Sequence, residues 1–221
     1  MGLKIMNIVL VSPYDITHPG GVSEHVIALA QGLTSRKHTV YILAACSQRQ
    51  PHLSPLVRPV TTTVLRVSVG GAVARIGISP LSYFRIKKIL HAIAVDVVHL
   101  QEPLVPGLNW WALLLATRLP KTVTIGTFHA FRESSSGIFQ LGLPVLHPFF
   151  NRLDALIAVS EVAQEFASRW FPGDYNIIPN GIELERFGSN NWSPRAARQA
   201  VTILFVGRLE KRKGFETLFE A

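Results

Sequence analysis

VSPYDITHPGGVSEHVIAL, residues 11–29, joins a predicted strand to a predicted helix through a polar turn. The apolar run that ends at Val11 indicates a buried strand. Beyond the turn, apolar residues recur at helical spacing along one face, at Val22, Val26, Leu29, Ala30 and Leu33. The turn holds a proline, a tyrosine, an aspartate, a histidine and the pair Gly20-Gly21. It therefore combines polar side chains with an accessible backbone at the start of a helix.

The same alternation of strand and helix continues along the chain. Strands are expected at residues 4–12, 38–45, 62–69, 95–101, 121–129, 155–160 and 175–180. Helices are expected at 22–37, 79–94, 107–119, 161–170 and around 146–154, and a Pro-rich connection runs to residue 60. Because the strands are continuous apolar runs, they are expected to be buried on both faces. This predicts an α/β fold with a doubly wound, mostly parallel, Rossmann-like sheet.

The composition is that of a core-forming globular protein. Of the 221 residues, 48% are hydrophobic and 16% charged, which excludes a disordered chain. The net charge of +8, from 22 Lys and Arg against 14 Asp and Glu, favours an anionic partner. A phosphorylated small molecule, a membrane surface and nucleic acid all fit this charge, as does an ordinary basic protein without such a partner.

Cys46 is the single cysteine. This excludes an intramolecular disulfide and a thiolate zinc site, and a reducing, cytosolic setting is expected. The most apolar stretch, around residues 109–119, is interrupted by Arg118 well before the ~20 residues of a membrane span. We therefore expect no segment that crosses a membrane.

The end of the chain predicts a second unit. Residues 188–200 are polar and indicate a linker that follows an N-terminal domain of residues 1–187. Residues 201–221 open a new strand, turn and helix, but they fall short of the roughly 50 residues that a domain needs. We expect them to be the truncated start of a C-terminal domain.

Polar and ionisable residues follow several of the predicted strands, at the sheet edge where open α/β sheets bind ligands. The Gly20-Gly21 pair favours an anion at the helix N-terminus, although a tight turn would explain it as well. Arg208 and Lys213 flank a turn and suit a diphosphate group, although a solvated charged turn has the same composition. Neither G-x-G-x-x-G nor a P-loop occurs, so NAD-type and P-loop sites are disfavoured.

An ordered set of segments resembles the GT-B glycosyltransferases of family 4, and within them the phosphatidylinositol mannosyltransferases. The segments are SPYDITHPGGVSEHV, DVVHLQEP, GTFHAF, IAVSE, IIPNGIELERF and ILFVGRLEKRKG. The resemblance covers nearly the whole chain. It implies two Rossmann-like domains with the active site between them, a retaining mechanism and no required metal or cofactor. It also implies a nucleotide-sugar donor, GDP-mannose, held mainly by the C-terminal domain.

The resemblance also assigns roles to individual residues. It places His129 at the transferred sugar as the catalytic residue, and Gly20, Gly21, Arg208 and Lys213 at the donor diphosphate. It places Tyr14 and Arg75 near the lipid-linked or polyol acceptor, and we add Asp15 and Ser23 to this acceptor set. A cationic clamp on the departing phosphate would be favoured in the transition state, where negative charge develops.

Three positions depart from the family pattern. Ser23 stands where the mannosyltransferases carry a larger amide, Gly70 where they carry Asn, and Gln101 where they carry a histidine. These differences weaken the acceptor assignment more than the donor chemistry. They leave open a different sugar or acceptor within the same class of enzyme.

The helix expected at residues 79–94 has a basic side. Its apolar face consists of Tyr83, Ile86, Ile89, Leu90 and Ile93. The remaining side combines basic and bulky apolar residues, namely Leu81, Phe84, Arg85, Lys87, Lys88 and His91. This combination predicts a helix that rests on an anionic membrane surface, with a solvated helix as the alternative.

The leading hypothesis is therefore a cytoplasmic glycosyltransferase, peripheral at the inner face of the membrane, that transfers mannose or another hexose to a lipid-linked or polyol acceptor. As a fragment without most of the donor domain, the isolated chain is expected to be inactive. The alternative is a non-catalytic module that binds an anionic lipid or phosphate ligand. Nucleic acid is disfavoured as a partner because the basic residues are not interleaved with stacking aromatics.

Overall fold

The computed structural model describes residues 4–48, 54–69, 72–129, 137–182, 203–207 and 213–220. Strands of the described residues join in one sheet, whose parallel part has the order β3-β2-β1-β6-β7-β8-β9. The strands are β1 (Asn7–Asp15), β2 (Thr39–Ala45), β3 (Val57–Thr61), β4 (Val64–Val69), β5 (Ala72–Gly77), β6 (Val97–Gln101), β7 (Val123–Phe128), β8 (Ala155–Ala158) and β9 (Tyr175–Ile177). The helices are α1 (Gly21–Ser35), α2 (Ser82–Ala92), α3 (Leu108–Ala116), α4 (Gly137–Phe150), α5 (Glu161–Ser168) and α7 (Phe215–Glu220).

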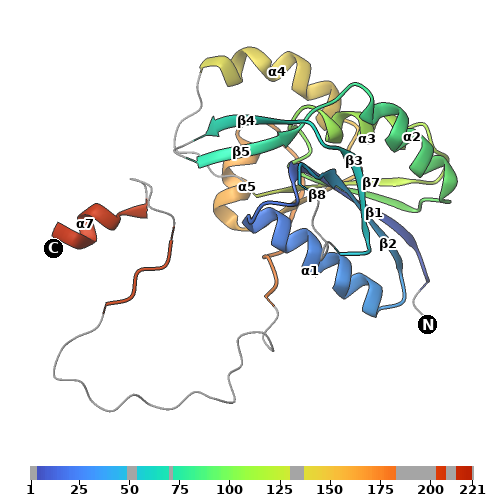
Figure 1. Cartoon of the computed structure of the whole chain (residues 1–221). Coiled ribbons are helices and arrows are strands. Elements are labelled where there is room, and N and C mark those ends of the chain that lie inside the picture. Colours follow the sequence, from blue (N-terminus) through green and yellow to red (C-terminus); the bar gives the residue numbers. More distant parts are fainter. Residues whose placement is uncertain are drawn as a thin grey trace.

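Helices cover both faces of the parallel sheet (Figure 1). On one face α1 packs on a cluster that includes Leu10, Val26 and Ile42. On the other face α2 and α3 pack on Val9, Leu43, Leu100 and their neighbours. Residues next to each other in β1 thus enter different clusters, as expected of a strand buried on both sides. The predicted doubly wound α/β fold is confirmed.

Two strands in the region between β2 and α2, namely β3 and β5, were not expected. Val57–Thr61 forms β3 within the segment predicted to be a connection, and it lies at the edge of the sheet. Pro59 argues against a strand in the sequence, because proline is tolerated in a sheet mainly at its edge. The strand predicted at 62–69 exists as β4, but it pairs with β5 as an antiparallel hairpin instead of joining the parallel strands.

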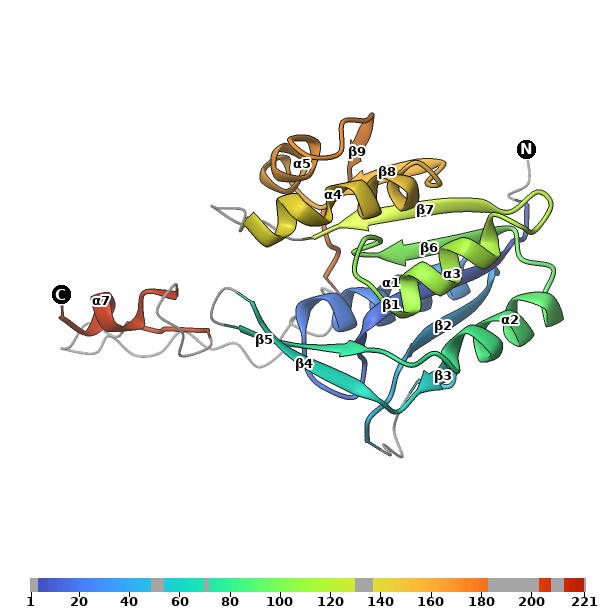
Figure 2. The ribbon, with the colours of Figure 1, turned by 90° about the horizontal axis from the view of Figure 1, so that it is seen from above.

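The β4–β5 hairpin is anchored against the end of β1 and the start of α3. Tyr14 of β1 pairs with Ile76 of β5. A Cβ atom at Gly77 would lie 2.7 Å from Cβ of Ala45, so only glycine permits this close approach. Gly107 has φ 102°, and a Cβ atom there would lie 2.6 Å from the carbonyl oxygen of Gly77. The hairpin projects from this anchor beyond the carboxyl ends of the parallel strands (Figure 2).

Helix α2 has the two sides predicted for it. Ile86 and Leu90 are fully buried, and Tyr83, Ile89 and Ile93 pack at the margin of the same cluster. The basic residues Arg85, Lys87 and Lys88 are exposed. Leu81, which immediately precedes the helix, is 65% exposed and Phe84 is 66% exposed, so burial against the sheet accounts for neither.

The second unit predicted from residue 201 onward is described only in part. Residues 203–207 are not a strand, in contrast to the prediction, and Ile203, Leu204 and Val206 are largely exposed. A strand requires a hydrogen-bonded neighbour, and no described residue pairs with this segment. The predicted helix is present as α7. The linker at 188–200 lies outside the described residues, so the domain boundaries stay a prediction.

Among the helices that the structure describes, none is both long and apolar enough to span a bilayer.

Candidate functional site

The order of the parallel strands reverses between β1 and β6. From β1 the chain proceeds outward through β2 to β3, and from β6 outward in the other direction through β7 to β9. Open α/β sheets form a crevice at this reversal, outside the carboxyl ends of the two strands. The segments that leave β1, β6 and β7 at this edge carry most of the site residues predicted from the sequence.

Three histidines meet at this edge. His25 comes from α1, His99 from β6, and His129 from the residue after β7. The rings of His25 and His129 are in edge-to-face contact, with centroids 5.2 Å apart. Nε2 of His99 lies 2.6 Å from Oγ1 of Thr127, a neighbour of His129 on β7. The cluster thus connects α1 to β6 and β7.

The histidines of the cluster are held in the neutral form. Burial is the main cause that lowers the pKa of His129, from 6.5 to about 4. The charges that His25 and His99 would carry lower it further. Burial and the proximity of His25 lower the pKa of His99 to about 4 as well. Burial also lowers the pKa of His25. At neutral pH, His129 is therefore a hydrogen-bonding group without charge.

Hydrogen bonds fix the position of His129. Its Nε2 lies 2.7 Å from Oε1 of Gln101, and its backbone N–H donates to Oε1 of Glu102 over 2.8 Å. Because the amide oxygen of Gln101 only accepts, it selects the tautomer with the proton on Nε2. Nδ1 of His129 and Nε2 of Gln101 are buried and have no partner within the described residues. Buried polar atoms without a partner are rare in folded proteins.

The loop after β6 is held in a strained conformation. Glu102 has φ 51°, in the left-handed region that residues with a Cβ rarely adopt. The side-chain amide of Asn109, on α3, donates to the carbonyl oxygens of Gln101 and Glu102, each over 2.8 Å. Strain of this kind persists where surrounding contacts impose it, often at functional sites.

The N-terminus of α1 opens at the same edge. Gly20 is the N-cap, with φ −173°, and α1 has no side-chain cap hydrogen bond. A Cβ atom at Gly20 would meet only Oγ of Ser23, at 3.9 Å, and one at Gly21 would meet nothing within 4 Å. Neither backbone conformation nor packing requires glycine here. Gly21 and His25 lie one helical turn apart, so the exposed backbone is on the side of α1 that carries the histidine contact.

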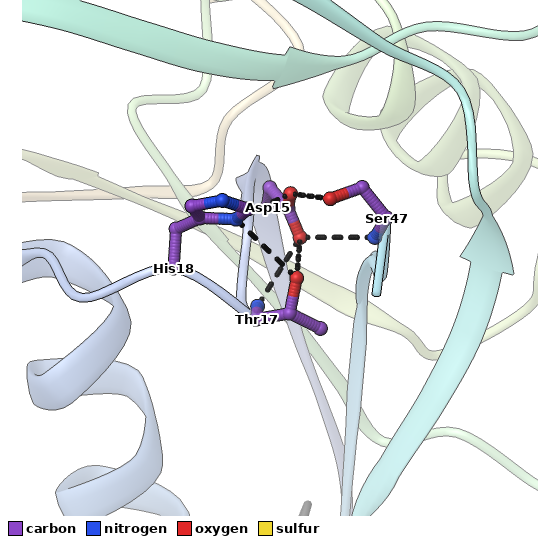
Figure 3. Close-up of polar contacts among 4 residues, drawn as sticks. All are labelled: Asp15, Thr17, His18 and Ser47. Carbon is purple, nitrogen blue, oxygen red and sulfur yellow. Dashed lines mark hydrogen bonds and ion pairs between the residues drawn. The ribbon is translucent and has the colours of Figure 1, made fainter. Parts of the chain in front are cut away.

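Asp15 supports the loop that leads to this N-terminus (Figure 3). Its buried carboxylate accepts hydrogen bonds from the backbone N–H groups of Thr17 and Ser47 at 3.1 Å and from both hydroxyl groups. Nδ1 of His18 lies 2.9 Å from the same carboxylate. Burial alone would raise the pKa of Asp15, but the hydrogen bonds from Ser47 and Thr17 lower it below its ordinary value. The carboxylate thus holds the loop in place, and contact with an acceptor stays a prediction.

The other predicted site residues are distributed unevenly. Tyr14 pairs with Ile76, so its backbone lies close to Arg75. Adjacent residues of a strand project to opposite faces, so this pairing places Arg75 on the other face of the ribbon from Tyr14. Ser23 lines a separate hollow of about 360 Å³ with Thr17, Ile27 and other residues, on the side of α1 opposite His25. Lys213 is exposed, and Arg208 and Gly70 lie outside the described residues.

The sequence did not single out His25, Thr127 or Asn109. His25 and Thr127 join the cluster through the contacts of His129 and His99, and Asn109 through the loop carbonyls. The sequence does place His25 one helical turn after Gly21, on the same side of the predicted helix as the glycine pair. No local pattern marks Thr127 or Asn109.

Comparison with known proteins gives matches along most of the chain. Residues 19–186 match the family model "Glycosyltransferase Family 4". The chain is 33% identical over 220 residues to a protein of Mycobacterium tuberculosis (strain CDC 1551 / Oshkosh) named phosphatidyl-myo-inositol mannosyltransferase. It is 34% identical over 226 residues to a protein of that name from Propionibacterium freudenreichii subsp. shermanii. These matches cover 98% of this chain and 56% and 57% of the two relatives.

Solved structures share the fold. An α-glucosyltransferase in complex with UDP-glucose and DNA containing an abasic site superposes with a TM-score of 0.53 and 12% identity, over 87% of this chain and 47% of that one. At this identity the likeness concerns the fold alone.

The family match over residues 19–186 and the 33% identity along the chain establish the family: this chain belongs to glycosyltransferase family 4.

Proposed function

We propose that this chain carries the acceptor-side part of a retaining glycosyltransferase that moves mannose from GDP-mannose to the headgroup of an inositol phospholipid. The observation that carries the proposal is the 33% identity, over 98% of the chain, to a phosphatidyl-myo-inositol mannosyltransferase. The chain spans about 56% of that relative. The donor sugar, the acceptor and the activity are therefore proposed for a protein of the relative's length. No metal or cofactor is part of it.

The geometry around His129 supports a role at the transferred sugar. In glycosyl transfer, positive charge builds on the sugar while negative charge builds on the departing phosphate. A neutral imidazole can hydrogen-bond a sugar hydroxyl without opposing the positive charge. The low pKa of His129, about 4, keeps it in this form at neutral pH.

The N-terminus of α1 supports a role at the donor diphosphate. The exposed Gly20 and Gly21 let an anion approach unpaired N–H groups at the positive end of the helix dipole. In the proposal, Arg208 and Lys213 neutralise the same diphosphate as it leaves. We further propose that residues 201–221 open a second Rossmann-like domain, which in a protein of the relatives' length completes the donor site.

An enzyme assay tests the function. A protein of the relatives' length is incubated with radiolabelled GDP-mannose and vesicles that contain phosphatidylinositol, and transfer to the lipid fraction is measured. UDP-glucose, UDP-N-acetylglucosamine and inositol phosphate serve as alternative donors and acceptor. Label in the lipid only with GDP-mannose and phosphatidylinositol is the expected result. Transfer to water-soluble acceptors alone would contradict the lipid acceptor, and transfer from another donor would contradict the donor.

We further propose peripheral attachment to an anionic membrane at its cytoplasmic face, and the exposed side of α2 supports the attachment. Leu81 and Phe84 are about two-thirds exposed beside the exposed Lys87 and Lys88. Each basic residue near an anionic surface contributes roughly 1 kcal/mol of attraction. We therefore expect Phe84→Ser with Lys87→Glu and Lys88→Glu to abolish co-sedimentation with phosphatidylglycerol-containing vesicles.

A matched variant controls for charge and exposed apolar area. Val162→Ser with Arg118→Glu and Lys121→Glu makes the same change in charge at exposed positions outside α2. We expect this variant to sediment with the vesicles like the unchanged chain. Equal binding by the α2 variant would show that α2 is not the membrane surface.

A further inference from the structure

The net positive charge of this chain comes from one block of the sequence. No Asp or Glu occurs between Glu24 and Asp96, while residues 25–95 contain nine Lys and Arg. The remainder of the chain has thirteen basic and fourteen acidic residues, so it is close to neutral. The block includes α2 and the β4–β5 hairpin. The hairpin is thus a basic element without acidic residues, which favours an anionic ligand.

Two arginines lie directly opposite each other in the hairpin. Arg66 of β4 is the cross-strand partner of Arg75 of β5, so both side chains leave the same face of the ribbon. The Cβ atoms of such a pair are about 5 Å apart, and like charges at this distance destabilise a hairpin. Arg66 is exposed and Arg75 half-buried. In the described part of the chain neither forms an ion pair with a carboxylate.

The position of the pair suits ligand binding. Arg75 is adjacent to Ile76, which pairs with Tyr14 at the end of β1. The hairpin extends past the carboxyl ends of the parallel strands, on the side of the sheet edge that carries the histidine cluster (Figure 2). Ser68 is exposed and lies two residues beyond Arg66 on the same face of β4, where its hydroxyl adds a donor.

We propose that Arg66 and Arg75 together bind one phosphate group on this face of the hairpin. A guanidinium donates two parallel hydrogen bonds to phosphate oxygens, and two guanidinium groups on one anion remove the repulsion between them. The inference rests on the proposed function in one respect, since it takes the acceptor's phosphate as the group that binds there. The family resemblance assigns a role to Arg75 alone, whereas Arg66 is identified from the strand register.

Binding to the 221-residue chain, without donor and without turnover, tests the site. Inorganic phosphate is titrated against the unchanged chain, Arg66→Ala and Arg66→Lys, and the arginine side-chain NMR signals are followed. Arg66→Ala is expected to weaken phosphate binding roughly tenfold, the loss of one charge-assisted contact. Arg66→Lys is expected to recover part of it, because the charge returns without the bidentate geometry. Arg118→Ala, between α3 and β7 at the opposite edge of the sheet, is the matched control and should bind normally.

Thermal unfolding gives a second measurement. Phosphate should raise the Tm of the unchanged chain by mass action and leave that of Arg66→Ala almost unchanged. In phosphate-free buffer Arg66→Ala should not melt below the unchanged chain, because the substitution removes repulsion. A lower Tm in phosphate-free buffer would contradict the like-charge argument.

Vesicles separate the two sources of phosphate. Neutral vesicles with phosphatidylinositol are compared with free phosphate, using the same variants. A defect of Arg66→Ala with vesicles alone assigns the site to the lipid headgroup, and a defect with free phosphate alone assigns it to a soluble phosphate. Normal binding of Arg66→Ala in both arms would overturn the proposal. Since neither arm uses the transfer reaction, a failed glycosyltransferase assay would leave this result intact.

Discussion

His129→Ala, in a protein of the relatives' full length, is expected to lower kcat by roughly 10²- to 10³-fold, the usual loss when one preorganised hydrogen-bonding group is removed from a reaction centre. The imidazole is fixed by Gln101 and Glu102 and is neutral at working pH. In the proposed function, its removal deletes a contact at the transferred sugar while the acceptor contacts remain. Steady-state kinetics should therefore show a fall in kcat with little change in the KM for acceptor.

The pH profile and a control variant sharpen this test. Because the pKa of His129 lies near 4, its titration should produce no limb in kcat around pH 6.5, the ordinary value for histidine. His147→Ala, which removes a histidine of α4 that contacts Phe171, should retain most of the turnover. Near-normal kcat for His129→Ala would remove this residue from the reaction centre.

Asp15→Ala is expected to destabilise the chain by about 3 kcal/mol at neutral pH, because it leaves buried donors of Thr17 and Ser47 without an acceptor. The pKa of Asp15 is lowered in the fold, so the stabilisation is present above the ordinary value of 3.8 and is lost as pH falls through the folded pKa. Urea unfolding followed by circular dichroism should show a large difference from the unchanged chain at pH 7. The difference should shrink below pH 3.8.

Asp15→Asn is the matched variant for this network. It keeps the size of the side chain and one carbonyl oxygen, but its amide group cannot accept the hydroxyl hydrogen of Ser47. Its loss of stability at pH 7 should be smaller than that of Asp15→Ala. This loss should likewise shrink on acidification, because the group that titrates is the carboxylate of the unchanged chain. Equal urea midpoints for the unchanged chain and Asp15→Ala at pH 7 would show that the network adds nothing to stability.

Most of the fold follows from local pattern. The apolar runs of β1, β2, β6 and β7 mark buried strands because a strand covered on both faces has no need of polar alternation. The missed elements lie between β2 and α2, where β3 is short and at the sheet edge and β5 is rich in alanine and glycine. Their formation depends on partners distant in the chain, such as Tyr14 for β5.

The candidate site was only partly predictable. The residues that follow the strands, Gln101 and His129 among them, were found because parallel strands end at a common edge. Asp15 and Ser23 occur in the same segment as Tyr14, but Asp15 turns into its own loop and Ser23 lies on the other side of α1. Side-chain direction after a strand end depends on loop conformation, which the local pattern does not specify.

The sequence by itself determined the class of fold, the edge of the sheet at which polar groups collect, and the exposed basic side of α2, because these depend on residue periodicity and on chain order. Only the tertiary structure decided the contact of His25 with His129, the neutral state of the histidines and the pairing of Arg66 with Arg75. Each of these depends on burial or on the register between segments far apart in the chain. Neither property is encoded in any short stretch.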